Sequence, residues 1–448
     1  MSIIERQIRN MIENPYRNAT YDNLNRFFQP NAFSQTNVNI SHRAASTNFF
    51  ASATRFNQRG TLETNEGFIR DNFRLNLDHR LRDDFSLQLG VQHSRYDQDL
   101  LYQGSSGSGG IFFDLLLFPA DVNIARRDAN GRYLQQPDSS VLVTNPLWYE
   151  DSREYYEKRA RTIANIDARF NPLQWLTVSG TLGYDRSDLN SQAYTPRGTS
   201  TSLTSEQSSN GFLRRDDEVG DALTASAQAN LTHNFGDLST RTVVRALLER
   251  ERREFLRADG SNFWVEGVPR MNVAADRTIS SSLTDIRSSG YSLDQQVDYA
   301  GRYILTGLIR RDGSSLFGPD NRWHNYYRVG GAWRVAEEPW FNYDPITELK
   351  LRYARGTAGS RPNFNAQYET WSVSNSGQVT KNTLGNRNLA PEHTTEQEFG
   401  VDMIFRDRYS LQLSYARNKV EDQLIQIPLA APFGYTAQWQ NAGTIEGN

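Results

Sequence analysis

The sequence predicts an all-β protein, an antiparallel up-and-down transmembrane β-barrel that crosses the bilayer with its strands. Three observations support this fold class. Apolar and polar residues alternate over many segments, which is typical of strands that have one face against an apolar medium and the other against water. Many of these segments approach the 9–11 residues that a membrane-crossing strand needs. Short turns and long loops also alternate strictly along the chain, as they do in barrels that have turns at one rim and loops at the other.

The composition excludes several other classes of protein. The 448 residues have a formal charge of −3 and no Lys/Arg cluster, which argues against a nucleic-acid partner. No run of about 18 apolar residues exists, so a transmembrane helix is excluded, whereas half-apolar barrel strands are not. Without Cys there are no disulfides and no thiolate metal sites. The first residues, MSIIERQIRN, lack the apolar core of a secretory signal.

The clearest alternating stretch is residues 295–335, and the rest of the chain repeats its pattern. It predicts a strand, a tight turn at residues 299–302, a second strand, a polar loop at 311–325 and a third strand. One face of the second strand holds Tyr303, Leu305, Gly307 and Ile309. One face of the third strand holds Tyr327, Val329, Gly331, Trp333 and Val335. The loop contains the turn sequences Asp-Gly-Ser-Ser and Gly-Pro-Asp-Asn.

The same period of two predicts strands from Thr36 onward, about fourteen in all. The other predicted strands lie near residues 36–40, 48–56, 69–78, 85–92, 163–170, 176–184, 223–235, 240–250, 290–297, 349–353, 399–405 and 409–415. In one of them the alternation predicts that Phe85, Leu87, Leu89 and Val91 face lipid and that Ser86, Gln88 and Gln92 face the lumen. Before the first strand, residues 1–35 show no clear periodicity apart from a short helix predicted over about the first ten.

Short turns are expected near residues 80–84, 171–174, 236–239 and 406–408, and long loops at 96–161, 187–221, 256–287 and 357–394. Because connections at one rim of a meander recur at every second hairpin, the long loops would share the extracellular rim and the turns the periplasmic rim.

Several segments resemble the SusC/RagA class of TonB-dependent outer-membrane transporters of Bacteroidetes-type bacteria. The similar stretches are NFRLNLDHRLRDDFSL (72–87), YILTGLIRRDGSSLFG (303–318), LAPEHTTEQEFGVD (389–402), LQLSYARNKVEDQLIQIPL (411–429) and GYTAQWQNAG (434–443). The combination of the Arg-Asp-Gly-Ser-Ser…Phe-Gly loop with the Gln-Asn-Ala-Gly segment is the most specific of these features.

The resemblance implies a location in the cell outer membrane of a Gram-negative bacterium and a barrel of about 22 strands around a plug. It also implies import of a nutrient, an oligosaccharide (glycan) or a peptide, with a SusD-like surface lipoprotein and with TonB acting through the N-terminal region. On this basis residues 1–35 lead into the barrel and 36–448 form a partial TonB-dependent receptor barrel, an internal fragment. The plug domain and the C-terminal strands are then expected to lie outside this sequence.

No catalytic, cofactor-binding or metal-binding residues are predicted, so the chain is not expected to be an enzyme. The six His are scattered without paired spacing, and the Gly/Ser tract 104–110 lacks the Lys of a phosphate-binding loop. The sequence Asp128-Ala129-Asn130-Gly131 predicts a turn, because the downstream Glu of a calcium loop is missing. The substrate-binding residues are not assigned.

The aromatic residues fall into two groups. Those in the long loops could stack on a substrate, but packing of the loops or of a lid partner is favoured; they are Trp148, Tyr149, Trp264, Tyr368 and Trp371. Those near strand ends fit an interfacial girdle; they are Trp323, Tyr326, Tyr327, Trp333 and Trp340. Two alternatives stay open: a passive or structural barrel without TonB coupling, and a secreted soluble β-domain that binds polysaccharide.

Overall fold

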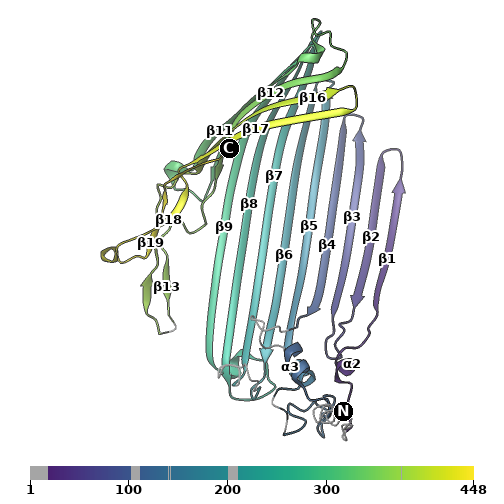
Figure 1. The fold of residues 1–448 in the computed structure, drawn as a ribbon, viewed down its shortest axis with the longest axis vertical. Helices are drawn as coiled ribbons and strands as arrows, with labels where there is room; N and C mark the ends of the chain where they lie inside the picture. The colour runs from purple at the N-terminus through teal and green to yellow at the C-terminus, as the bar shows by residue number, and fades with distance from the viewer. Residues whose placement is uncertain are drawn as a thin grey trace, which may run out of the picture.

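The computed structural model describes residues 19–101, 111–139, 141, 143–199, 210–374 and 376–447. The helix predicted over the first ten residues and the Gly/Ser tract 104–110 lie outside these ranges. The described chain forms a 15-stranded antiparallel sheet in which strands follow one another in chain order (Figure 1). The sheet contains β1 (Phe33–Arg43), β2 (Thr47–Gln58), β3 (Phe68–Arg82), β4 (Phe85–Asp99), β5 (Glu154–Leu173), β6 (Leu176–Thr195), β7 (Phe212–Phe235), β8 (Leu238–Phe263), β9 (Ala274–Tyr299), β10 (Tyr303–Ser314), β11 (Trp323–Arg334), β12 (Ile346–Ser360), β16 (Glu392–Phe405), β17 (Tyr409–Glu421) and β20 (Thr444–Gly447).

The remaining elements are short and lie in the connections. They are α2 (Asn23–Phe27), α3 (Ile111–Leu117), α4 (Pro146–Asp151), η1 (Met271–Val273), η2 (Pro319–Asn321), η3 (Val335–Glu337), η4 (Ala431–Phe433), β13 (Trp371–Val373), β14 (Val379–Lys381), β15 (Thr383–Leu384), β18 (Leu424–Pro428) and β19 (Ala437–Asn441). Within the described residues, none of the helices has both the length and the apolar character needed to cross a bilayer.

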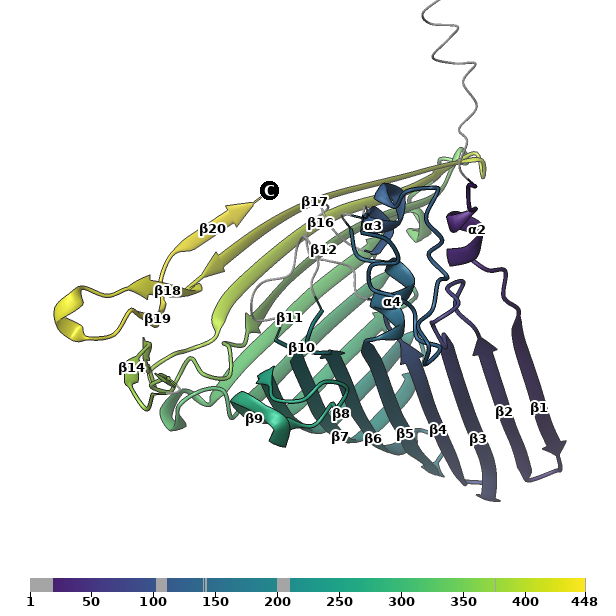
Figure 2. The ribbon, with the colours of Figure 1, turned by 90° about the horizontal axis from the view of Figure 1, so that it is seen from below.

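The sheet is strongly curved and open, with β1 at one edge and β20 at the other (Figure 2). All its pairings are between antiparallel neighbours, so the up-and-down all-β fold is confirmed, and the open sheet is that of a partial barrel. From β1 to β9 the tight turns lie at one rim and the longer connections at the other (Figure 1). The turn between β9 and β10 has two consecutive residues with positive φ, Ala300 (56°) and Gly301 (68°), whose twist matches that of the flanking strands.

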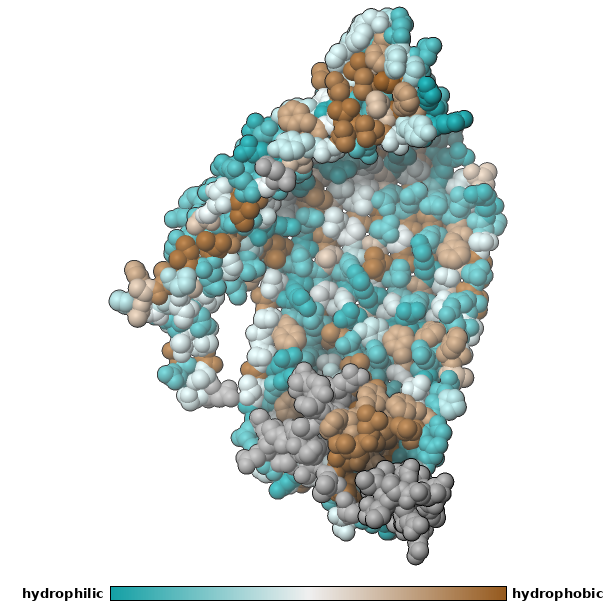
Figure 3. Space-filling view, in the orientation of Figure 1, coloured by the Kyte–Doolittle hydropathy of each residue, from teal (hydrophilic) through white to brown (hydrophobic). Residues whose placement is uncertain are grey.

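The strand register sorts the side chains into an apolar and a polar face, as the alternation predicts. On β4, Leu89 lies directly between Leu77 of β3 and Ile166 of β5. The same face continues through Leu182, Ala225, Leu248, Ile309, Val329, Leu351, Val401 and Leu413. Gln88 lies on the opposite face, between Asp78 and Asp167. Figure 3 looks onto the hollowed, concave side of the sheet, where hydrophilic colours predominate.

Two predicted loops are wrong over most of their length, because the strands extend much further. The expected loop 187–221 is largely β6 and β7, and the expected loop 256–287 is largely β8 and β9. Most residues of these extensions are polar, and isolated apolar residues such as Ile279 and Leu283 are too few to mark a regular apolar period. Cross-strand ion pairs hold them, with Arg257–Asp216 and Arg253–Glu218 both 2.7 Å apart and Arg214–Asp259 2.8 Å apart. The other two long loops are shorter than expected, at 100–153 and 361–391.

The largest buried cluster lies outside the sheet, in the connection between β4 and β5. Ile111 and Leu115 of α3 and Leu147 of α4 pack there with Phe27 of α2, and all four are 5% exposed or less. Asn145 links distant parts of this connection, because its side-chain amide donates to the Ile124 and Leu134 carbonyls at 2.7 and 2.9 Å. Both α3 and α4 lie on the concave side of the sheet (Figure 2). The connection therefore folds as a compact unit beside the mouth of the curved sheet.

Candidate transport surface

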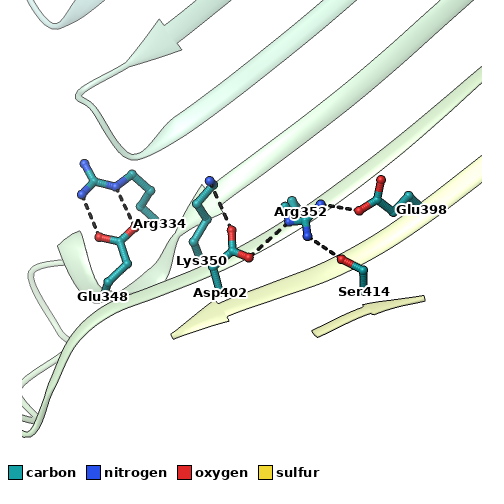
Figure 4. A network of polar contacts seen from close by, with 7 residues as sticks. All are labelled: Arg334, Glu348, Lys350, Arg352, Glu398, Asp402 and Ser414. Atoms are coloured by element: carbon teal, nitrogen blue, oxygen red, sulfur yellow. Dashed lines mark hydrogen bonds and ion pairs between the residues drawn. The ribbon is translucent and has the colours of Figure 1, made fainter. Parts of the chain in front are cut away.

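The polar face of β11, β12, β16 and β17 carries a network of ion pairs at the end of the sheet (Figure 4). The Arg334 guanidinium donates from Nε and Nη2 to the two Glu348 oxygens at 3.2 and 2.9 Å. Asp402 accepts from Lys350 at 3.3 Å and from Arg352 Nε at 3.4 Å. Arg352 also pairs with Glu398 and donates to Ser414 Oγ at 2.6 Å.

Each cation of this network is paired with at least one carboxylate, and Arg334 also pairs with a fourth carboxylate, Glu337, at 3.1 Å. The charged side chains of the network in Figure 4 are 22–35% exposed, so they are partly desolvated but still in contact with solvent. In such positions charged hydrogen bonds fix side-chain geometry while adding little net attraction for ions of either sign. The surface therefore offers many donors and acceptors to a polar solute, and all three of its cations are already paired with carboxylates.

A pocket of about 660 Å³ lies further along the same strands, toward the longer connections. Its lining includes Arg310, His324, Tyr326, Arg361 and Glu396. Tyr326 was expected in the interfacial girdle, and this prediction is wrong. Tyr326 is opposite Arg310 in the strand register, and its side chain lies on the other face of β11 from that of Tyr327, so it belongs to the polar face. Gly359 makes room for it, since a Cβ there would lie 2.1 Å from the Tyr326 hydroxyl oxygen.

The connection between β10 and β11 holds the long loop 361–391 beside this pocket. It covers residues 315–322 and is shorter than the predicted loop 311–325, because Asp312, Gly313 and Ser314 end β10. Leu316 and Phe317 are 4% and 3% exposed, and Leu389 of the long loop is fully buried. Asn321 Nδ2 donates to the Asn388 carbonyl at 2.8 Å, and Gln367 Nε2 donates to the Ser315 carbonyl at 2.8 Å. A Cβ on Gly318 would lie 2.1 Å from the Arg387 carbonyl oxygen, so only glycine permits this approach.

A half-buried glutamate, Glu150 of α4, lies at the longer-connection rim near Asp99 and Arg153. Burial raises the pKa of Glu150 from 4.5 to about 7; Arg153 lowers it and Asp99 adds a smaller increase. Burial is also the main cause that raises the pKa of Asp99. Among the described residues Glu150 Oε1 has no hydrogen-bond partner, and burial keeps the carboxyl protonated up to about neutral pH.

The loop aromatics do not form one surface. Trp148 packs against the buried cluster of the β4–β5 connection, as the packing interpretation predicted, and the Arg153 guanidinium lies 4.4 Å from the Tyr149 ring. Trp371 instead meets Tyr435 edge to face, with Lys381 Nζ about 5 Å from both rings. Trp264 and Tyr368 are exposed at 66% and 43%.

Four of the five strand-end aromatics are exposed as a girdle requires. Trp323, Tyr327 and Trp333 of β11 are 36–41% exposed on the apolar face, and Trp340 is 62% exposed. The rings of Tyr303 and Trp333 stack, and Tyr303 Oη and Trp333 Nε1 both donate to Glu338. Arg302 adds an ion pair to the same carboxylate at 3.0 Å.

The remaining sequence predictions concern single motifs. Asp128 Oδ1 accepts from the backbone N–H groups of Asn130 and Arg132 at 2.8 and 2.9 Å, which confirms the turn. Over the described ranges, no cluster of His, Asp and Glu is suited to hold a metal ion. The charged network was not predicted: its residues are visible in the alternation of β12 and β16, but their pairing depends on the register between strands.

These features define a class: a curved antiparallel sheet with an apolar outer face, a polar inner face and its longer connections at one rim, as in outer-membrane barrels. The chain matches the family described as "TonB dependent receptor-like, beta-barrel" over residues 111–447. Because this match covers more than half of the sequence, the chain belongs to the family of TonB-dependent receptor β-barrels, whose members are outer-membrane receptors and transporters.

Relatives and solved structures agree with this assignment. The chain is 24% identical to TonB-dependent receptor P26 of Formosa agariphila over 96% of this chain and 44% of that protein. It is 28% identical to TonB-dependent receptor SusC of Bacteroides thetaiotaomicron over 32% of this chain and 16% of that protein. The chain therefore spans less than half the length of these relatives.

Among solved structures, the RagAB peptide transporter matches with a TM-score of 0.73 and 18% identity, covering 99% of this chain and 51% of that chain. The siderophore receptor PirA of Acinetobacter baumannii matches with a TM-score of 0.54 and 12% identity, covering 94% and 58%. At these identities the structural matches show the fold alone.

Proposed function

We propose that the chain is the major part of a barrel wall that imports a nutrient, an oligosaccharide or a peptide, across the outer membrane of a Bacteroidetes-type bacterium. In the complete protein, TonB would drive import by acting on an N-terminal plug, and a SusD-like lipoprotein would cover the outer mouth. The wall itself performs no bond chemistry and binds neither a cofactor nor nucleic acid.

One observation carries this proposal: a single sheet has an apolar outer face and a polar inner face, and the cations of the inner network are paired with carboxylates. Trp323 and Trp333 bound the apolar face on β11. They are about 33 Å apart along the strand, or about 25 Å in height at a tilt of about 40°, which is the height of the apolar band of a membrane barrel. The inner face suits hydrated solutes that bring their own donors and acceptors.

The matches support the substrate class and partners as proposals. One similar solved structure is a peptide transporter, and one similar relative is SusC. An oligosaccharide and a peptide both fit a wall with many hydrogen-bonding groups.

The test is uptake by intact cells that express the complete gene with its neighbouring lipoprotein gene. Fluorescent oligosaccharide and peptide pools should accumulate only when TonB is present and the lipoprotein gene is intact. Accumulation that persists after TonB depletion would favour a passive barrel. Recovery of the protein in the medium without detergent would favour a secreted polysaccharide-binding domain.

The orientation is tested with epitope tags in the same cells. We expect tags in the connections 100–153, 196–211, 264–273 and 361–391 to bind antibody from outside and tags in the turns 83–84, 174–175 and 406–408 to be hidden. The reverse pattern would place the long connections in the periplasm and contradict the proposed topology.

A further inference from the structure

The apolar face of the sheet contains a groove of about 810 Å³ over β6 to β11. Its floor is made of Ala227, Ala229 and Ala246, which lie next to one another across β7 and β8. The bulkier side chains of Leu293 and Ile309 are also part of the lining. Because an alanine side chain is a single methyl group, the surface over these alanines is lower than the surface over Leu293 and Ile309. The volume is within the roughly 300–1,000 Å³ typical of ligand sites.

An aromatic pair marks the end of this groove toward the longer connections. Tyr291 and Trp323 stack with ring centroids 6.1 Å apart, and the Arg311 guanidinium lies 5.4 Å from the Trp323 ring. Arg311 lies on the apolar face, because it pairs with Tyr291 in the β9–β10 register. Tryptophan with a neighbouring arginine is typical of the level at which hydrocarbon gives way to lipid headgroups.

Directly beyond this level the same face becomes cationic. A second depression of about 740 Å³ begins two residue pairs further along β9 and β10, at Ser289 and Gly313. Its lining includes Arg250, Arg287 and Arg322, with Asp285 between the first two. Asp285 pairs with Arg250 at 2.8 Å and with Arg287 at 3.5 Å.

Positive charge therefore exceeds negative charge at this level. In the part of the chain that the structure describes, neither Arg311 nor Arg322 forms an ion pair with a carboxylate. The lining of the second depression has two carboxylates, Asp285 and Glu249, and Asp285 is shared by two arginines. An excess of guanidinium groups at the end of an apolar groove complements a molecule that has an anionic head and apolar chains. Arginine binds phosphate well, because its planar fork donates two parallel hydrogen bonds to the phosphate oxygens.

We propose that this surface binds a membrane lipid with a phosphate-bearing headgroup. The acyl chains lie over Ala227, Ala229 and Ala246, and the phosphate is held by Arg311 and Arg287. The proposal rests on the proposed placement of this face in the outer membrane, and it names a specific lipid site there. A free phosphate ion would use the arginines but not the alanine groove.

Native mass spectrometry of the complete transporter in mild detergent tests the proposal. The probes are phosphatidic acid, diacylglycerol with the same acyl chains, and inorganic phosphate alone. We expect phosphatidic acid adducts on the unmodified protein, with diacylglycerol and phosphate binding far more weakly. An Arg287→Gln/Arg311→Gln variant should lower phosphatidic acid binding on the order of tenfold, since each arginine near a lipid surface contributes to the attraction of an anionic headgroup.

A second variant, Ala246→Phe, fills the groove without changing charge and should also weaken phosphatidic acid binding. Arg55→Gln is the matched control; this arginine lies on the same face of β2, far from the groove, and should leave binding unchanged. Equal binding of diacylglycerol, retention of phosphatidic acid by both variants, or an equal loss with Arg55→Gln would each overturn the proposal. Fractionation with the outer membrane is measured separately, so a failure of the proposed placement is distinguishable from a failure of the lipid site.

Discussion

Replacing Leu89 by arginine should destabilise the complete protein in a bilayer far more than replacing its neighbour Gln88 by arginine. Leu89 is about 13 Å along β4 from Phe85, or about 10 Å in height at a tilt of about 40°. It therefore lies near the middle of an apolar band about 25 Å tall, between Leu77 and Ile166. An arginine on the lipid-facing side at that depth should cost about 2–4 kcal/mol of unfolding free energy.

Gln88→Arg is the matched control, because it adds the same charge one residue away on the opposite face. The new guanidinium would lie between Asp78 and Asp167, which are directly opposite Gln88 on β3 and β5. We expect a change within about 0.5 kcal/mol, since an exposed ion pair contributes little.

The assay is urea unfolding of the complete protein folded into phospholipid vesicles, followed by tryptophan fluorescence. The difference between the two variants is the informative quantity, because both carry the same added side chain. If Gln88→Arg cost as much as Leu89→Arg, the assignment of the two faces would be wrong. If neither variant changed stability, this part of β4 would not lie in the hydrocarbon.

Three further predictions concern the rims. Gly318→Ala should loosen loop 361–391, because its Cβ would meet the backbone of that loop, and amide hydrogen exchange should rise there; Gly307→Ala, where a Cβ meets nothing within 4 Å, should leave exchange unchanged. Glu338→Gln should lower the unfolding free energy in urea by about 1–3 kcal/mol, since the carboxylate that Arg302, Tyr303 and Trp333 share loses its charge. Glu337 is exposed, so Glu337→Gln should cost under about 0.5 kcal/mol. Equal losses for the two variants would contradict the structural role of the buried Glu338 carboxylate. Because the pKa of Glu150 is raised, the stability that its neutral form gives is present at low pH and is lost as pH rises from about 4.5 to about 7. The amide protection factors of segment 111–153, taken relative to the intrinsic exchange rate at each pH, should therefore be lower at pH 8 than at pH 5. Glu150→Gln should reduce this difference, and an unchanged pH dependence of the protection factors would exclude Glu150 as its source.

The alternation of residues determined much of this fold before any tertiary contact was known. Leu87, Leu89 and Val91 alternate with Gln88 and Gln92 because a strand between lipid and water must turn every second side chain outward. The tight turn at 299–302 and the Asp128 turn are equally local, since they depend on backbone angles that a few residues set. Such signals gave the strand order, the two faces and the alternation of turns with longer connections.

The tertiary structure decided what depends on pairing between distant residues. The strand extensions 187–195 and 274–287 have no regular apolar period, because most of their residues are polar. Cross-strand ion pairs between β7 and β8 support this part of the sheet. Whether Arg352 meets Glu398 and Asp402 depends on the β12–β16 register, which nothing local specifies. The burial of Leu316 and Phe317 likewise requires loop 361–391 to fold back over them, a contact between segments that only the complete sheet brings together.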